Sequence, residues 1–145
     1  MKKWLFVLAT LFFVVGCRQP ELPNAYYGLG DTFQFAEREF TLGTELVWSQ
    51  IDGETVFEVP FTVINPTQEL MPLNVYFGVV NPNGNSDSLL KSVFEDSVYN
   101  YYGYLPANDT FQSTAAIRYV GDGEYRLELS NFDDGYVVVK IHVTK

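Results

Sequence analysis

The chain has 145 residues, and its nine basic and eighteen acidic side chains give it a formal net charge of −9 at pH 7. This length indicates one domain, and a hydrophobic content of 47% is sufficient for a buried core. The negative charge argues against a general nucleic-acid-binding protein, because such proteins need a basic face to displace counterions from phosphates. The chain has one cysteine and one histidine, which excludes an internal disulfide, a cysteine-based zinc site and a multi-histidine metal site.

The first 17 residues have the pattern of an export signal. Lys2 and Lys3 precede residues 4–15, which are apolar except for Thr10. A membrane-spanning helix needs about 20 apolar residues, so this segment is too short to cross a bilayer and resembles a secretory signal peptide. The residues Val-Val-Gly-Cys at positions 14–17 resemble the bacterial lipobox, which lipoprotein-processing enzymes recognise.

The lipobox resemblance implies cleavage of residues 1–16 and a diacylglyceryl thioether on Cys17. Two acyl chains hold a protein firmly in a membrane, whereas one chain holds it only marginally. The mature chain would carry seven basic and eighteen acidic side chains, a charge of −11, so the lipid rather than the protein surface would hold it to anionic membranes. We expect residues 17–30 to be a lipidated tether and residues 31–145 to form the domain.

From Asp31 onward the hydrophobic pattern has a period of two, which is typical of strands with one buried face. In four segments, the side chains expected to face the core are Phe57, Val59, Phe61 and Val63; Leu73, Val75, Phe77 and Val79; Tyr125, Leu127 and Leu129; and Val137, Val139, Ile141 and Val143. Weaker candidates for strands are Thr32–Leu42, Thr44–Ile51, Val98–Leu105 and Thr110–Val120.

Turn residues separate these segments. Asp52 and Gly53 predict a tight two-residue hairpin. Pro60 has no N–H, so we expect its strand to be an edge or to carry a bulge at that point. Only Ser86–Asp96 breaks the strand pattern, and its apolar residues fit one helical stripe, which predicts a helix of about two turns. Seven to nine short antiparallel strands in about 110 residues indicate an all-β, immunoglobulin-like β-sandwich.

Several short motifs occur in an order that resembles the telokin-like, immunoglobulin-like domains of bacterial surface lipoproteins. They are Gly-Asp-Thr-Phe at 30–33, Thr-Val-Ile-Asn-Pro-Thr at 62–67, Leu-Pro-Ala-Asn-Asp-Thr at 105–110, and Gly-Glu-Tyr-Arg-Leu at 123–127 before a valine-rich last strand. Tyr125, which follows a glycine-rich turn, resembles the tyrosine corner of such domains. The resemblance implies an extracellular, non-catalytic domain and supplies no catalytic residues.

The residue types indicate no catalytic or metal chemistry. A catalytic triad would need His142, the only histidine, and alternation places His142 on the wet face of its strand. The segment 83–94 begins with the oxygen-ligand spacing of a calcium loop but lacks the Gly and Glu that an EF-hand needs at positions six and twelve. We therefore expect no enzyme activity, no cofactor and no metal ligands, with a weak calcium site in Asn131–Gly135 left open.

A cluster of tyrosines provides the strongest binding signal in the sequence. Four of the six residues at positions 99–104 are tyrosines, namely Tyr99, Tyr101, Tyr102 and Tyr104. In a strand, these side chains would lie on both faces, so some of them should be exposed. Exposed tyrosine suits recognition of a partner, because the ring gives contact area while its hydroxyl stays solvated. Packing of the same rings across strands is the alternative explanation.

These features favour a lipid-anchored, non-catalytic domain that binds a protein or polymer partner on the outside of a bacterial membrane. Arg18 stands where Gram-negative lipoproteins retained in the inner membrane carry Asp, which favours the outer membrane if the cell is Gram-negative. Two other functions stay open. The chain also resembles, more loosely, the small β-sandwich proteinase inhibitors of bacteria, with Asn81–Asn85 or Pro106–Asp109 as the inhibitory loop. A small glycan-acting envelope enzyme is the third possibility.

Overall fold

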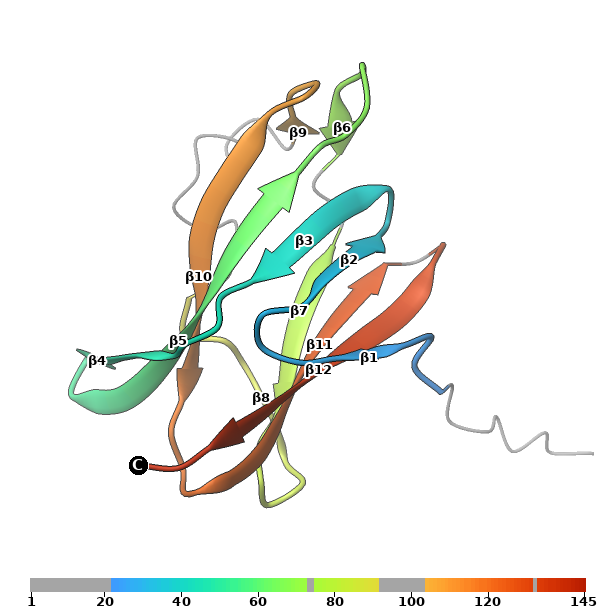
Figure 1. Ribbon diagram of the computed structural model, residues 1–145. Helices are drawn as coiled ribbons and strands as arrows, with labels where there is room; N and C mark the ends of the chain where they lie inside the picture. The colour runs from blue at the N-terminus through green and yellow to red at the C-terminus, as the bar shows by residue number, and fades with distance from the viewer. Residues whose placement is uncertain (1–21, 73–74, 92–103, 132) are drawn as a thin grey trace, which may run out of the picture.

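The computed structural model describes residues 22–72, 75–91, 104–131 and 133–145, which form a β-sandwich (Figure 1). The strands in chain order are β1 (Tyr26–Tyr27), β2 (Thr32–Phe35), β3 (Arg38–Leu42), β4 (Val47–Ile51), β5 (Glu54–Ile64), β6 (Met71–Pro72), β7 (Tyr76–Val80), β8 (Ser86–Asp87), β9 (Tyr104–Leu105), β10 (Thr110–Arg118), β11 (Gly123–Asn131) and β12 (Gly135–Val143). The described part of the chain has no helix, and thus none that is long and apolar enough to cross a bilayer.

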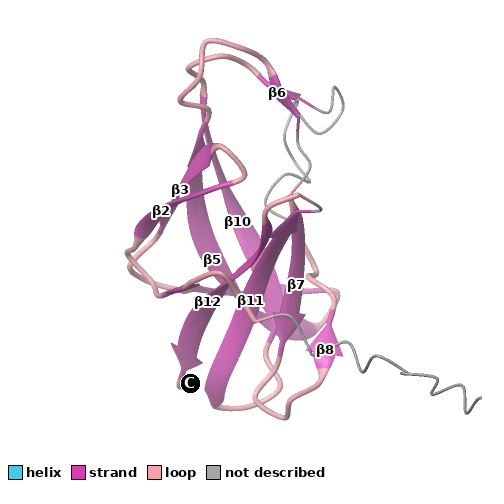
Figure 2. Ribbon diagram, turned by 90° about the vertical axis from the view of Figure 1, so that its right-hand side faces the viewer, coloured by secondary structure: helices cyan, strands magenta, loops and turns pink. Residues whose placement is uncertain are grey.

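Two sheets form the layers of the sandwich (Figure 2). Sheet A has the strand order β1-β12-β11-β7-β8, and sheet B has the order β10-β5-β3-β2, with β4 also paired to β5. The short pair β6 and β9 lies at one end of the sandwich (Figure 1). The chain passes from β5 in sheet B to β7 in sheet A, and again from β10 to β11, so that each sheet contains strands from both halves of the sequence.

The core lies between the two sheets and uses the faces that alternation predicted. Every predicted core residue of β5, β11 and β12 is at most 3% exposed, and these residues belong to one hydrophobic cluster. Val75 and Val79 are also buried, and Phe77 packs against the same cluster, whereas Leu73 lies outside the described residues. The ring of Phe61 meets those of Phe40 and Phe77 edge-on, with centroids 6.4 and 6.0 Å apart. The strand pattern of these segments is confirmed.

The first strand lies within the segment that the sequence suggested as a tether. Tyr26 and Tyr27 pair in parallel with Val138 and Val139 of β12, and the ring of Tyr27 stacks on that of Phe33 with centroids 4.0 Å apart. Strand β1 adds a parallel edge to sheet A and a ring to the core. The folded part of the chain therefore begins before Asp31.

Two hairpins turn through residues with positive φ. Asp52 and Gly53, at φ values of 51° and 83°, join β4 to β5 in the predicted tight turn. Ala36 and Glu37, at φ values of 50° and 61°, divide the weak candidate Thr32–Leu42 into β2 and β3. Neither Ala nor Glu favours this conformation. The buried guanidinium of Arg38 donates a hydrogen bond to the Ala36 carbonyl and supports the turn from inside.

The expectation that β5 is an edge strand or carries a bulge at Pro60 is wrong, because β5 is an interior strand of sheet B and pairs with β10 in unbroken register. One side of β5 pairs continuously with β10, and the other side pairs first with β4 and then with β3. The carbonyl of Pro60 accepts a hydrogen bond from the Gly43 N–H at 2.8 Å, in the gap between these two partners. The N and C=O of one strand residue point to the same side. The missing N–H of Pro60 therefore faces the gap, where no ladder bond is lost.

The gap next to Pro60 requires glycine at position 43. A Cβ on Gly43 would come within 2.9 Å of two carbons of the proline ring, which is rigid. We expect Gly43→Ala to lower the free energy of unfolding by about 1–3 kcal/mol, as overpacking does. Gly78→Ala is the matched control, because a Cβ there meets nothing within 4 Å. It should leave stability unchanged or raise it by about 0.5–1 kcal/mol. Chemical denaturation measures both changes, and equal effects would contradict the steric explanation.

The helix predicted over Ser86–Asp96 is wrong for the residues that are described, and residues 92–96 lie outside them. Ser86 and Asp87 form β8, which pairs with β7 at the edge of sheet A. The chain then reaches sheet B, where the Leu90 N–H donates to the Ala116 carbonyl and the Ala116 N–H donates to the Lys91 carbonyl, both at 2.9 Å. A two-turn helix is marginal by itself, and the backbone here finds partners on the edges of both sheets.

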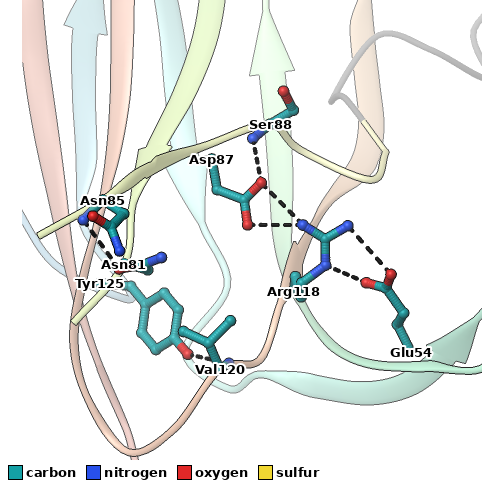
Figure 3. Close-up of polar contacts among 8 residues, drawn as sticks. All are labelled: Glu54, Asn81, Asn85, Asp87, Ser88, Arg118, Val120 and Tyr125. Carbon is teal, nitrogen blue, oxygen red and sulfur yellow. Dashed lines mark hydrogen bonds and ion pairs between the residues drawn. The ribbon is translucent and has the colours of Figure 1, made fainter. Parts of the chain in front are cut away.

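The hydroxyl of Tyr125 ties the connection between β10 and β11 to the core (Figure 3). It accepts a hydrogen bond from the Val120 N–H at 2.9 Å and donates one to the Gly121 carbonyl at 3.0 Å. Its fully buried ring meets that of Phe57 edge-on at 4.8 Å. These contacts have the form of a tyrosine corner, in which a hydroxyl binds the backbone a few residues upstream.

Candidate functional site

The structure describes only one of the five residues that the sequence suggested for lipidation or binding. Cys17, Tyr99, Tyr101 and Tyr102 lie outside the described residues. Tyr104 lies in β9, opposite Pro72 of β6, and half of its side chain is exposed. Among the described residues, a second candidate site lies on sheet A.

A groove of about 560 Å³ crosses the outer face of sheet A. The residues that line it come from three adjacent strands and are Tyr76, Phe77 and Gly78 of β7, Glu128, Ser130 and Asn131 of β11, and Gly135 and Tyr136 of β12. We call it the tyrosine groove. Its volume lies within the range of small-molecule and side-chain binding sites, about 300–1,000 Å³.

Two tyrosines on opposite sides of a serine form the walls of the tyrosine groove. Ser130 on the middle strand is the register partner of Tyr76 on one side and of Tyr136 on the other. Strands lie about 4.8 Å apart, so the two tyrosines stand about 10 Å apart across the sheet. Side chains on a strand stand roughly perpendicular to the sheet. Between the two rings, the short side chain of Ser130 leaves a slot.

A carboxylate and a glycine continue the slot along the strands. Glu128 lies two residues from Ser130 on the same face of β11, and its register partner on β7 is Gly78. Glycine in the interior of a strand costs stability and often marks a bulge or the close approach of another group. The register through Gly78 is regular, and a Cβ there would meet nothing within 4 Å. Because no packing among the described residues requires this glycine, we infer that it keeps the groove open above Glu128.

A third aromatic ring on the outer face of sheet A, that of Tyr26, already lies against a cation. The ammonium of Lys140 lies 4.6 Å from the centroid of the Tyr26 ring. Tyr26 pairs with Val138, which is the neighbour of Glu128 on β12. This face of the sheet therefore combines exposed tyrosines with charged groups of both signs.

The outer face of sheet B, in contrast, satisfies its polar groups internally. The Glu58 carboxylate accepts hydrogen bonds from the Thr114 hydroxyl at 2.6 Å and the Ser49 hydroxyl at 2.8 Å. These bonds, the one from Thr114 first, lower the pKa of Glu58. Thr32 and Thr41 bond to each other through their hydroxyls at 2.9 Å. A shallow groove of about 460 Å³ lies over Pro60 on this face, but it contains no charged side chain.

The most concentrated ionic contacts join the two sheets and have a structural role (Figure 3). The Arg118 guanidinium at the end of β10 binds both oxygens of Asp87 in β8, at 3.0 and 2.9 Å, and also binds Glu54 of β5. It thereby holds the edge strand of sheet A against sheet B. In residues 22–72, 75–91, 104–131 and 133–145, no three His, Cys, Asp or Glu side chains come close enough to hold a metal ion.

A coupled pair of groups near the C-terminus gives a pH-dependent prediction. The Tyr119 hydroxyl donates to Asp122 at 2.6 Å, and this bond raises the pKa of Tyr119 to about 12. Because the folded pKa exceeds the ordinary value of about 10, the bond contributes stability below pH 10 and loses it as the pH rises towards 12. Asp122→Asn should bring the ionisation of Tyr119 back towards pH 10, measured by NMR of ¹³Cζ-labelled tyrosine. Asp133→Asn, which removes the same charge beyond the opposite end of β11, should leave it unchanged.

Sequence reasoning missed the tyrosine groove, although part of its signal was present. Alternation places Tyr76 and Gly78 on the wet face of one strand and Glu128 and Ser130 on the wet face of another. An exposed tyrosine two residues from a glycine within a strand was the available hint. The pairing that brings β7, β11 and β12 side by side joins segments up to 60 residues apart and carries no local signal.

Comparison with known proteins supports the fold. An uncharacterized β-sandwich protein from Clostridium difficile superposes with a TM-score of 0.58 at 13% sequence identity, over 85% of this chain and 97% of that chain. A conserved hypothetical protein from Bacillus anthracis superposes with a TM-score of 0.47 at 15% identity, over 76% of this chain and 94% of that chain. No family model matches the sequence, and neither does any curated protein. The first of these similarities shows that the chain has a β-sandwich fold, which by itself does not specify a function.

Proposed function

We propose that this protein is a lipid-anchored, non-catalytic domain of the bacterial cell envelope that binds a protein or polymer partner outside the membrane. The observation that carries the binding role is the tyrosine groove, with its two tyrosine walls and an interior glycine that packing within the described part of the chain does not require. The export signal and Cys17 support the anchor. Partly exposed tyrosine and a groove of this size are typical of recognition surfaces.

We further propose that the sandwich belongs to the immunoglobulin-like class. Three features support this assignment: the parallel pairing of β1 with the last strand, the crossings from β5 to β7 and from β10 to β11, and the tyrosine-corner contacts of Tyr125. Domains of this class commonly serve in binding at cell surfaces. The assignment agrees with the proposed function but does not identify the partner.

The anchor is tested by the fate of Cys17. Wild-type protein grown with an alkyne-tagged fatty acid should be labelled and should sediment with membranes. Cys17→Ser should carry no label and should not be cleaved before residue 17, since the thioether requires sulfur. A wild-type protein that carries no lipid, or that retains Met1, would overturn the anchored part of the proposal.

The binding role is tested by closing the groove without disturbing the fold. Gly78→Leu places a side chain in the open space above Glu128, so it should abolish in-cell crosslinking to the partner while thermal stability is kept. Thr62→Leu on the outer face of sheet B is the control, because it adds a similar side chain to the other groove. If Gly78→Leu leaves crosslinking unchanged, the groove is not the binding site.

The exposed loop Asn81–Asn85 favours proteinase inhibition as a second candidate. The Asn81 side chain accepts hydrogen bonds from the Asn83 and Asn85 N–H groups, at 3.0 and 3.2 Å, and its backbone pairs with Asn85 and Gly84. A loop held in one conformation loses little entropy on binding. Inhibition of a panel of serine and cysteine proteinases at micromolar protein, abolished by Asn81→Ala, would favour this function. Full proteinase activity in the whole panel would exclude it.

A further inference from the structure

We propose that the tyrosine groove recognises a single cationic side chain, a lysine or an arginine, presented by a partner protein. The side chain would lie between the rings of Tyr76 and Tyr136 with its charged end at Glu128. The inference deepens the binding role proposed above and rests on it. It is carried by the charge and the shape of the groove.

The carboxylate of Glu128 is available to an outside group. Its side chain is partly buried on the outer face of sheet A, and among the described residues it makes no hydrogen bond and no ion pair. The nearest basic side chains on this face are those of Arg126 and Lys140, a register pair two residues further along the strands. The ammonium of Lys140 lies on the Tyr26 ring. Other partly buried carboxylates differ: Glu58 is bonded to two hydroxyls and Asp87 to Arg118.

The slot has the width that one extended side chain needs. Its walls stand about 10 Å apart, and atoms in contact are about 3.5–4.0 Å apart, so one layer of atoms fits between the rings with about 1 Å to spare on each side. The methylene stem of lysine or the plane of a guanidinium satisfies this condition. Gly78 leaves open the space above Glu128 that the charged end would occupy.

The same chain shows that its aromatic residues hold cations. Lys140 lies over Tyr26, and Lys145 lies 5.6 Å from the Trp48 ring and 5.5 Å from the Tyr119 ring. A cation between two rings and next to an unpaired carboxylate gains both cation–π and charge-assisted contacts. The formal charge of −9 also attracts a basic partner over longer distances. An anionic ligand would be repelled by the same charges.

The test uses the full-length protein in detergent micelles and observes backbone amides by NMR. The probe is an end-capped Gly-Lys-Gly peptide, and its Gly-norleucine-Gly analogue keeps the stem without the charge. The lysine peptide should shift the amides of Gly78, Glu128 and Ser130, and the norleucine peptide should bind at least tenfold more weakly. Glu128→Gln should weaken lysine binding at least tenfold. Glu124→Gln, which removes the same charge further along β11, should change it less than twofold.

A second variant supplies the lysine side chain from the protein itself. Gly78→Lys puts an ammonium opposite Glu128 in the register of the sheet, so it should remove the shifts caused by the peptide while leaving the fold intact. Equal losses of affinity for the lysine peptide in Glu128→Gln and Glu124→Gln would show that only the net charge of the protein matters, and would overturn the inference. Binding of chitotetraose that Glu128→Gln does not weaken would overturn it in favour of a sugar site. If the lysine peptide does not bind while Gly78→Leu still abolishes crosslinking to the partner, the proposed binding function stands and the proposed ligand class is wrong.

Discussion

Asn65→Asp is expected to lower the free energy of unfolding by about 3–5 kcal/mol, the range found when a buried charge is left without compensation. Asn65 is fully buried, and its amide nitrogen donates to the carbonyls of Glu69, Leu105 and Pro106 at 2.8, 3.0 and 2.9 Å. Its side-chain oxygen accepts from the N–H and the hydroxyl of Thr67, at 3.0 and 2.7 Å. Aspartate keeps the shape but turns the amide donor that serves these three carbonyls into an acceptor.

The penalty in Asn65→Asp should depend on pH in a defined direction. A protonated carboxyl regains one donor, so the stability difference from wild type should be smaller at pH 3 than at pH 7. Urea unfolding monitored by tryptophan fluorescence measures both. Asn108→Asp is the control, since the Asn108 side chain bonds only to the exposed Gln68 amide; its effect should stay below about 1 kcal/mol. If Asn65→Asp lowers the free energy of unfolding only slightly, or by the same amount at pH 3 and pH 7, this explanation is contradicted.

Tyr125→Phe should cost about 1–3 kcal/mol, because it leaves the Val120 N–H and the Gly121 carbonyl without the hydroxyl that joins them. The ring stays packed on Phe57, so the variant isolates the hydrogen bonds. Tyr125→Ala removes the ring as well and should cost about 3–5 kcal/mol. The loss of stability in Tyr125→Phe measures the hydrogen bonds of the corner between β10 and β11. The additional loss in Tyr125→Ala measures the packing of the ring in the core.

Tyr119→Phe is the matched control for Tyr125→Phe. Its hydroxyl bonds to the exposed carboxylate of Asp122, where water can replace the lost partner, so the loss of stability should be well below that of Tyr125→Phe. Chemical denaturation measures all three variants. If the two Tyr→Phe changes prove equal, the corner has no special role in holding the connection.

The groove and the stability of the sheet are in conflict at Gly78. A β-branched residue there would improve the strand, because nothing obstructs a side chain, yet it would fill the slot above Glu128. Activity that requires an imperfect strand is a common form of the trade-off between stability and function. Gly78 therefore links the fold to the proposed binding role more directly than any other residue of the site.

The amino-acid sequence by itself determined the strand content and the core faces of this protein. Alternation in β5, β11 and β12 names which side chains are buried, because a sheet with one wet face needs a period of two. Asp52 and Gly53 also identify their hairpin, since both residues accept positive φ. The composition excludes several metal sites and a basic nucleic-acid surface. These properties follow from local chemistry and are visible without any knowledge of pairing.

Only the tertiary structure decided the remaining features. Ala36 and Glu37 form a turn against their own preferences because buried Arg38 and the core phenylalanines on both sides hold them there. Ser86 and Asp87 become a strand because sheet edges and Arg118 offer partners that an isolated helix lacks. The tyrosine groove exists because β7, β11 and β12 meet in one register. Long-range pairing of this kind is set by the burial of all strands together, which no single segment of the sequence encodes.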